Sequence, residues 1–190
     1  NRLREKYPQS KLYIVDSLGA SSGYGLIRET LADRRDEGKS IDEIHRWIEE
    51  HKLNREHWFF STDLQYYVRG GRISKASGFF GTLLRICPLL NRDEDGKLRP
   101  REKIRTIKKV EEAIVEKRKG DAANGKDYTG KVFISQSNCI NRANPVKDAV
   151  EAYFTKRNGK VVVNRIGTTI GSHTGPGTVA LFYWGKKRTS

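Results

Sequence analysis

The sequence has no methionine, only two cysteines and no long apolar run, and each absence narrows what the protein can be. Cys87 and Cys139 are too few for a disulfide framework, and neither belongs to a CxxC pair, so there is no basis for a zinc or redox site. No stretch approaches the roughly 20 apolar residues that a membrane-spanning helix needs. We therefore expect a soluble, cytoplasmic protein with no cofactor, no metal and no stable membrane insertion.

The missing methionine also bears on the extent of the chain. Because the 190 residues begin at Asn1 and contain no methionine, we expect that an upstream segment has been removed, either biologically or experimentally. A length of 190 predicts one full domain, or one domain and part of another. The net charge of +14 favours phosphate-rich, acidic or anionic-surface partners without choosing among them.

The first third of the chain has the pattern of a parallel α/β protein. Residues 11–17 (KLYIVDS) predict a strand buried on both faces, and a loop of small residues over 19–25 leads into a helix that ends near Gly38. Ser40 and Glu43 have the spacing of a capping box, which predicts a second helix. This part has too few strands for a stable sheet of its own.

Near residue 60 the pattern changes to hairpin and mixed elements. Strands are predicted over residues 57–61, 128–135, 161–166 and 178–184, helices over 62–67, 72–85, 103–119 and 144–154, a hairpin turn over 91–96, and a loop over 167–177. The expected fold class is α/β with two domains. Residues 1–60 are expected to be the remnant of a parallel-sheet first domain. Residues 61–190 are expected to form a nearly complete α/β sandwich with a mixed or antiparallel sheet and flanking helices.

One short motif indicates an enzyme. Residues 19–23 (GASSG) match G-x-S-x-G between a strand and a helix, the setting in which a nucleophilic serine is exposed on a tight turn. Ser21 would then need an acid and a histidine, and Asp63 followed by His173 satisfies the chain order of a serine hydrolase. The simpler interpretation is a strand-to-helix loop whose small residues let a ligand approach the helix.

Two glycine-rich segments are suited to anion binding. Residues 69–72 (RGGR) can bend sharply and present a guanidinium group, although a solvated helix end has the same composition. Residues 167–177 (GTTIGSHTGPG) combine four glycines with hydroxyl donors such as Thr174 and with His173. A lone histidine is more often a structural hydrogen-bond partner than a ligand, so both interpretations stay open.

Two further segments have competing interpretations. The basic residues over 99–109 are interleaved with and followed by glutamates, which favours a solvated or protein-docking surface over a nucleic-acid site. Phe79, Phe80, Leu83, Leu84 and Ile86 form an apolar cluster beside Gly78 and Gly81. Such a cluster belongs either to the core or to a groove for an apolar ligand.

The order of motifs resembles the DegV family of fatty-acid-binding proteins. The resemblance rests on IVDS, ASSGYG, DLQYYVRGGRIS, GTLLRICPLL, GKLRPREKIRT and IGSHTGPGTVALFYWG, and it covers essentially all 190 residues. It implies a two-domain α/β protein that holds one long-chain fatty acid between its domains. In Gram-positive bacteria such proteins present the fatty acid to a separate fatty acid kinase, so the protein would be a carrier and not a catalyst.

The resemblance also implies roles for individual residues. Arg72, His173 and Thr174 match the polar network around the carboxylate, and Arg105 matches a basic position that docks the kinase. Phe79, Leu83 and Ile86 lie where residues that line the acyl chain are plausible. On this resemblance, we expect the family's opening segment, with the first strands and hydroxyls that bind the carboxylate, to lie outside these 190 residues. The alternatives that remain are the serine hydrolase that uses Ser21 and a nucleic-acid-binding module.

Overall fold

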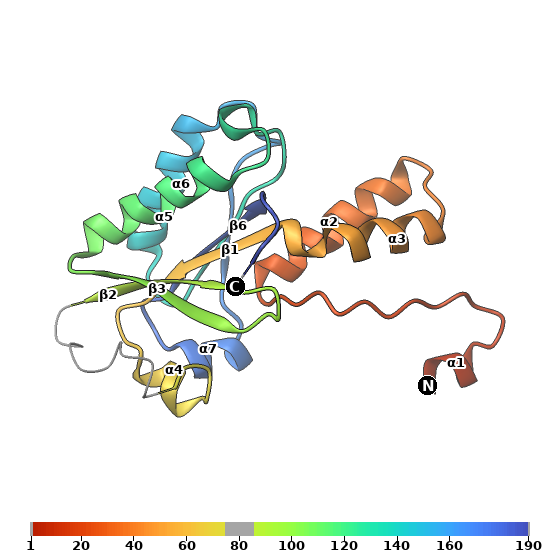
Figure 1. Cartoon of the computed structure of the whole chain (residues 1–190), viewed down its shortest axis with the longest axis horizontal. Helices are drawn as coiled ribbons and strands as arrows, with labels where there is room; N and C mark the ends of the chain where they lie inside the picture. Colours follow the sequence, from red (N-terminus) through yellow and green to blue (C-terminus); the bar gives the residue numbers. More distant parts are fainter. Residues whose placement is uncertain (1, 75–85, 190) are drawn as a thin grey trace.

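The computed structural model describes residues 2–74 and 86–189 and has the expected mixed α/β architecture, with one six-stranded sheet (Figure 1). The strand order is β3-β2-β1-β6-β4-β5. All neighbouring pairs are antiparallel except β4 and β5. The strands are β1 (Arg55–Phe60), β2 (Cys87–Arg92), β3 (Leu98–Ile104), β4 (Phe133–Gln136), β5 (Val162–Arg165) and β6 (Val179–Trp184).

The burial of each strand follows from its place in the sheet. β1 lies at the centre between β2 and β6, and every residue from Arg55 to Phe60 is buried although the sequence REHWFF is half polar. β3 lies at an edge, where exposed Arg99, Arg101 and Lys103 alternate with half-buried residues. The sequence of β1 therefore places polar side chains inside the protein, which a purely structural strand would avoid.

One face of the sheet is covered by two helices that pack side by side, α5 (Ile107–Asp121) and α6 (Ile140–Tyr153) (Figure 1). Val110 and Ile114 of α5 and Val146 and Val150 of α6 are fully buried against Trp58, Phe60 and the other strands. Helical spacing places these residues on one side of each helix. This larger hydrophobic cluster is the main core of the protein.

The opposite face is covered by α2 (Ser22–Asp36), which packs on β4 and β6, and by the short helices α4 (Gln65–Arg69) and α7 (Thr168–Thr174). A smaller cluster lies here, and it includes Leu26, Phe59, Tyr67 and Phe182. α3 (Ile41–His51) packs on α2, and the α2–α3 pair projects from the sheet (Figure 1). Short 3₁₀ turns precede β1 at Lys52–Asn54 and follow α5 at Gly125–Asp127.

The strand predicted over residues 11–17 is wrong. This segment is extended but not part of the sheet, and it runs away from the body of the protein toward α1 (Arg2–Lys6) (Figure 1). Ile14, expected to be buried, is 80% exposed. An apolar run becomes a strand only when a neighbouring strand accepts its hydrogen bonds, and none of the six described strands lies beside it.

Other local predictions were confirmed, or named the right element with different first and last residues. The capping box is present, since Ser40 Oγ accepts from Glu43 N and Glu43 Oε2 accepts from Ser40 N. The hairpin at 91–96 joins β2 and β3, but β3 extends into residues assigned to the next helix, which begins only at Ile107. β4 begins at Phe133 and not at residue 128. α6 begins at Ile140, so Pro145, taken as the helix start, lies inside it.

Two further predictions concern loops and the domain division. The predicted loop 167–177 contains α7, and residues 72–74 of the helix predicted over 72–85 are not helical, while 75–85 lie outside the described residues. The division at residue 60 falls at the end of central strand β1 and stays a prediction.

Between residues 2 and 74 and between 86 and 189, no helix has the length and hydropathy to span a bilayer.

Candidate functional site

A partly open cavity of about 190 Å³ lies on the face of the sheet that α2, α4 and α7 cover. Its floor is formed by side chains of the central strands, and its walls come from the loop before α2, from α4 and α7, and from the ends of β2, β3 and β5. The lining residues are Ala20, Ser21, His57, Phe59, Tyr67, Arg72, Arg92, Leu98, Ile166, Thr169, Ile170, His173, Thr174, Thr178 and Ala180.

Helix α7 brings His173 and Thr174 to the cavity. The ring of His173 lies against Gly70 at the end of α4, where an added Cβ would be 2.4 Å from His173 Nδ1. Thr174 is held through its backbone, since Thr178 Oγ1, just before β6, donates to Thr174 O at 3.2 Å. The glycine at position 70 is therefore a requirement of close packing between α4 and α7, and it lets the histidine reach the cavity wall.

Arg72 reaches the same cavity from the turn that follows α4. Gly71 has a φ of 68°, a left-handed conformation that glycine adopts without strain, and the chain turns there. Arg72 is exposed overall and its Nη1 donates to Gly70 O at 2.5 Å. The structure thus places Arg72, His173 and Thr174 around one cavity, although about 100 residues separate the first from the other two.

Ser21 also lines the cavity, and its backbone is strained where it caps the start of α2. Its φ of 53° and ψ of −142° are rare for a residue with a side chain. Its hydroxyl donates to Ser135 Oγ at 2.9 Å, and Asp63 Oδ1, the acid of the supposed triad, accepts from Gln65 N at 2.7 Å. The serine hydrolase has no support from this arrangement, because neither hydrogen bond is the one that a triad requires.

Two buried arginines hold the loop that carries Ser21. Arg55 Nη2 donates to Ser17 O and Leu18 O at 3.2 and 3.3 Å, and Arg188 Nη2 donates to Leu18 O at 3.3 Å. The guanidinium of Arg55 is so close to Gly19 that an added Cβ there would lie 2.1 Å from Nη1. Burial, together with Arg188 and Arg92, lowers the pKa of Arg55 to about 9. This loop is therefore fixed by cationic side chains beneath it.

Several residues that line the cavity were not predicted from the sequence, notably His57, Arg92, Tyr67 and Thr178. Burial, and next the charge of Arg55, hold the pKa of His57 well below its usual range, so the ring is neutral at physiological pH. A signal was present, because alternation along the strand at 57–61 places His57 and Phe59 on the same face. That pattern does not reveal whether the face meets a core or a cavity.

The apolar residues expected to line an acyl chain are placed differently. Phe79 and Leu83 lie outside the described residues, and Ile86 is half-buried just before β2 and does not line the cavity. The apolar part of the cavity lining comes instead from other residues. These are Phe59, Tyr67, Leu98, Ile166, Ile170 and Ala180. The prediction of a lining role for Ile86 therefore receives no support from the described cavity.

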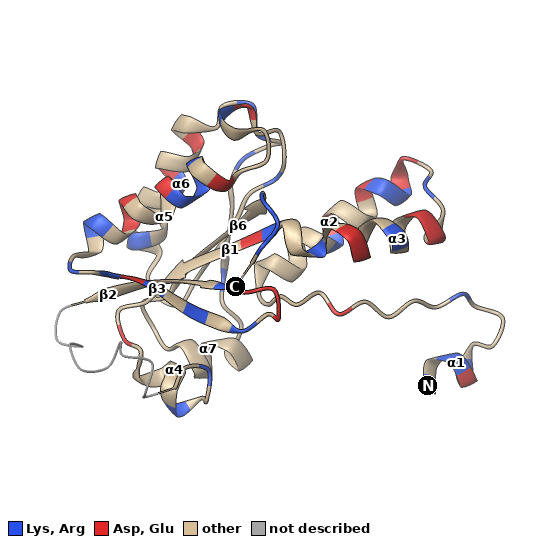
Figure 2. Cartoon of the chain, viewed as in Figure 1, with Lys and Arg blue, Asp and Glu red and all other residues tan. Residues whose placement is uncertain are grey.

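Arg105 lies away from the cavity, in the exposed turn between β3 and α5. Lys and Arg residues follow the exposed side of β3 and the first turn of α5, with acidic residues further along the helix (Figure 2). Glu102 within this stretch is paired with Lys117 at 2.6 Å. The segment is therefore an exposed surface with an excess of basic side chains, interrupted by acidic ones. Across the described residues, no group of His, Cys, Asp and Glu side chains has the arrangement of a metal site.

Comparison with known proteins shows that most of the chain matches one protein family. Residues 1–186 match the family described as "Uncharacterised protein, DegV family". The chain is 35% identical over 183 residues to a DegV domain-containing protein of Clostridium perfringens, covering 96% of this chain and 62% of that protein. It is 33% identical over 183 residues to a protein of Thermotoga maritima named fatty acid-binding protein, covering 93% of this chain and 60% of that protein.

A solved structure has the same fold. The Streptococcus pneumoniae Fatty Acid Kinase (Fak) B3 protein, loaded with linoleic acid, superposes with a TM-score of 0.83 at 22% identity over 96% of this chain and 63% of that one. The chain therefore spans less than two thirds of the length of the relatives it matches. Of these proteins, the Thermotoga maritima relative is named a fatty acid-binding protein, and the Streptococcus pneumoniae structure contains linoleic acid.

Proposed function

The chain belongs to the DegV family, and on that premise we propose that it binds a long-chain fatty acid and presents the carboxylate to a partner fatty acid kinase. Its own role is that of a carrier, with no catalytic step. The fatty acid is the ligand, and no cofactor takes part. The Thermotoga maritima and Streptococcus pneumoniae relatives support the ligand class, and the name of the latter supports the kinase partner.

The observation that carries this proposal is the composition of the cavity. The guanidinium of Arg72, the imidazole of His173 and the hydroxyl of Thr174 line it together with the apolar side chains of Phe59 and Ala180. A fatty acid needs this combination, because its carboxylate is costly to bury without hydrogen bonds while its chain gains from leaving water. Each buried CH₂ contributes about 0.8 kcal/mol, so the acyl chain supplies most of the affinity.

The exposure of Arg72 suits a ligand that is handed to another protein. A carboxylate held by an exposed guanidinium and by His173 at the cavity wall stays accessible to a phosphate donor, whereas full enclosure would prevent the reaction. Arg105 lies on the exposed basic surface between β3 and α5, where a partner can reach it. We assign kinase docking to this surface and carboxylate binding to the cavity.

The proposed ligand is tested by native mass spectrometry of the purified protein, before and after incubation with a mixture of long-chain fatty acids. We expect an adduct with the mass of one fatty acid, which also identifies the acyl chain. A mass without adduct in both samples would contradict the proposal. Salt-dependent binding to nucleic acid in the same preparation would favour the nucleic-acid alternative instead.

Arg72→Ala tests the carboxylate network. A hydrogen bond to a charged group is worth about 1.5–3 kcal/mol, so we expect fatty-acid affinity to fall by roughly ten- to a hundred-fold, as measured by calorimetry. Arg69→Ala is the matched control, because Arg69 lies three residues away, bonds to Gln65 Oε1 and does not line the cavity. Equal affinities for the two variants would remove Arg72 from the site.

A further inference from the structure

The cavity has a second cationic end that the proposed function does not use. Arg92, the last residue of β2, and His57 of β1 both line it, on the same face of the sheet as Phe59. His57 is only 6% exposed, and no described residue offers a hydrogen-bond partner to its Nδ1. The Nε atom of Arg92 is also buried without a partner. Buried polar atoms are normally satisfied, and because His57 and Arg92 line the cavity, a ligand bound there is able to satisfy these two atoms.

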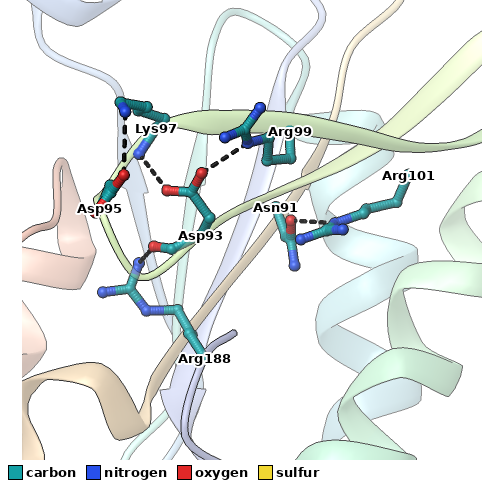
Figure 3. Close-up of polar contacts among 7 residues, drawn as sticks. All are labelled: Asn91, Asp93, Asp95, Lys97, Arg99, Arg101 and Arg188. Carbon is teal, nitrogen blue, oxygen red and sulfur yellow. Dashed lines mark hydrogen bonds and ion pairs between the residues drawn. The ribbon is translucent and has the colours of Figure 1, made fainter. Parts of the chain in front are cut away.

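The charge of Arg92 is not neutralised by the carboxylate next to it. Asp93 Oδ2 accepts from Arg99 Nε at 2.6 Å and Asp93 Oδ1 accepts from Lys97 N at 2.8 Å, so this carboxylate belongs to the hairpin turn (Figure 3). Asp93 O accepts from Arg188 Nη1, which brings another cation nearby. Among the described residues, no ion pair involves Arg92.

Other charges around this end reinforce the excess of positive charge. Burial, followed by the charge of Arg188, lowers the pKa of Arg92, although Asp93 and Asp16 act in the opposite direction. Arg55, Arg92 and Arg188 all lower the pKa of His57 as well. Three arginines therefore raise the electrostatic potential at the Arg92 end, and an anion placed there would relieve their mutual repulsion.

This end is well separated from the proposed carboxylate network. Thr174 O accepts from Thr178, which directly precedes β6, whereas Arg92 lies on β2, and β1 separates these two strands. Two inter-strand spacings correspond to about 10 Å, and Thr178 lies beside Ser61, which is four residues, or about 13 Å, further along the chain than His57. The apolar side chains of Phe59 and Ala180 lie on the strands between the two ends. One carboxylate cannot contact both groups of residues.

We propose that the cavity accepts a chain with an acidic group at each end, an α,ω-dicarboxylic acid, with one carboxylate at Arg72, His173 and Thr174 and the other at Arg92 and His57. The first carboxylate rests on the proposed function. The guanidinium of Arg92 binds the second one, and neutral His57 adds a single N–H donor. A plain fatty acid would leave the Arg92 end without an anion, and its methyl terminus would lie beside a charged group.

The test compares dodecanoic acid with dodecanedioic acid, and hexadecanoic acid with hexadecanedioic acid, by calorimetry on the whole protein. We expect the dicarboxylic acid of the better-fitting length to bind roughly tenfold more tightly than its monocarboxylic counterpart. Arg92→Met keeps an unbranched side chain but removes the guanidinium and its charge, and it should abolish or reverse this preference. Arg101→Met on neighbouring β3 is the control, because Arg101 is exposed and does not line the cavity.

The outcomes separate this inference from the proposed function. If wild-type protein binds the monocarboxylic acids as tightly as the dicarboxylic acids, and Arg92→Met changes neither, the second site is wrong while the carrier function stands. If neither class binds, the proposed function fails as well. Should Arg92→Met not fold, Arg92→Gln, which also removes the charge, replaces it. That variant must weaken dicarboxylic acids selectively, and an equal loss for both classes would overturn the inference.

Discussion

The two faces of the sheet bury side chains of the same strands in opposite ways. Under α5 and α6 the contacts are almost entirely apolar, with Trp58, Phe60 and Leu181 packed against fully buried helix residues. Under α2, α4 and α7, the alternate residues of β1 are Arg55, His57 and Phe59, and a cavity remains among them. One face is therefore a densely packed apolar core, while the other combines a smaller apolar cluster with polar side chains around a partly open cavity.

Buried arginines make the contrast sharper. On the first face Arg118 of α5 is fully buried, and its guanidinium lies 3.5 Å from the ring centroid of Phe154 and 4.3 Å from that of Tyr128. Aromatic faces compensate this cation within the protein. On the second face, no described aromatic ring or ion pair compensates the positive charge of Arg92, and this side chain lines the cavity. We regard the first arginine as structural and the second as available to a ligand.

The largest expected effect comes from the apolar face. Ile114→Ala removes a fully buried side chain of α5, and we expect the free energy of unfolding to fall by about 2–5 kcal/mol through lost burial and a cavity. Urea denaturation measures this change, with Glu112→Ala on the exposed side of the same helix as the control. Fatty-acid affinity of the folded variant should stay unchanged. A parallel loss of affinity would show that the two faces are coupled.

A smaller effect comes from Glu56, which is buried on the apolar face. Burial, and next the nearby charge of Asp121, raise the pKa of Glu56 from 4.5 to about 7. The folded state therefore holds the proton more tightly than the unfolded chain, so this group contributes stability below about pH 4.5 that is lost as pH rises to about 7. The full loss is about 3 kcal/mol.

Denaturation of wild type and Glu56→Gln at several pH values isolates this contribution. The variant has no proton to lose, so its stability relative to wild type should grow between pH 5 and pH 8, and other titrating groups cancel in the difference. Fatty-acid affinity serves as the second measurement, because Glu56 does not line the cavity. A difference in stability that is independent of pH would refute the raised pKa.

The smallest effect is expected on the cavity face. Ser21→Ala removes one hydroxyl from the cavity wall, and a hydrogen bond worth about 0.5–1.5 kcal/mol predicts a roughly two- to tenfold loss of fatty-acid affinity with little change in stability. Ser22→Ala is the control, since Ser22 Oγ accepts from Ser135 Oγ and does not line the cavity. Equal affinities for both variants would place Ser21 outside the ligand site.

Local chemistry allowed part of this architecture to be predicted. The capping box at Ser40, the hairpin turn after β2 and the glycines that end α4 depend on neighbours within a few residues, and all three are present. The strand predicted over 11–17 was wrong because a strand depends on a partner elsewhere in the chain. The helix within 167–177 was missed because its glycines and threonines have low helix propensity, which contacts with α4 outweigh.

The sequence by itself determined the class of fold, the family and the segments that carry Arg72, His173 and Thr174, because motifs and periodicity are properties of contiguous residues. Only the tertiary structure decided that these residues share one cavity with His57 and Arg92. It also decided that Arg118 is enclosed by aromatic rings while Arg92 lines the cavity. The physical reason is that desolvation and charge pairing depend on distances between side chains that lie far apart along the chain.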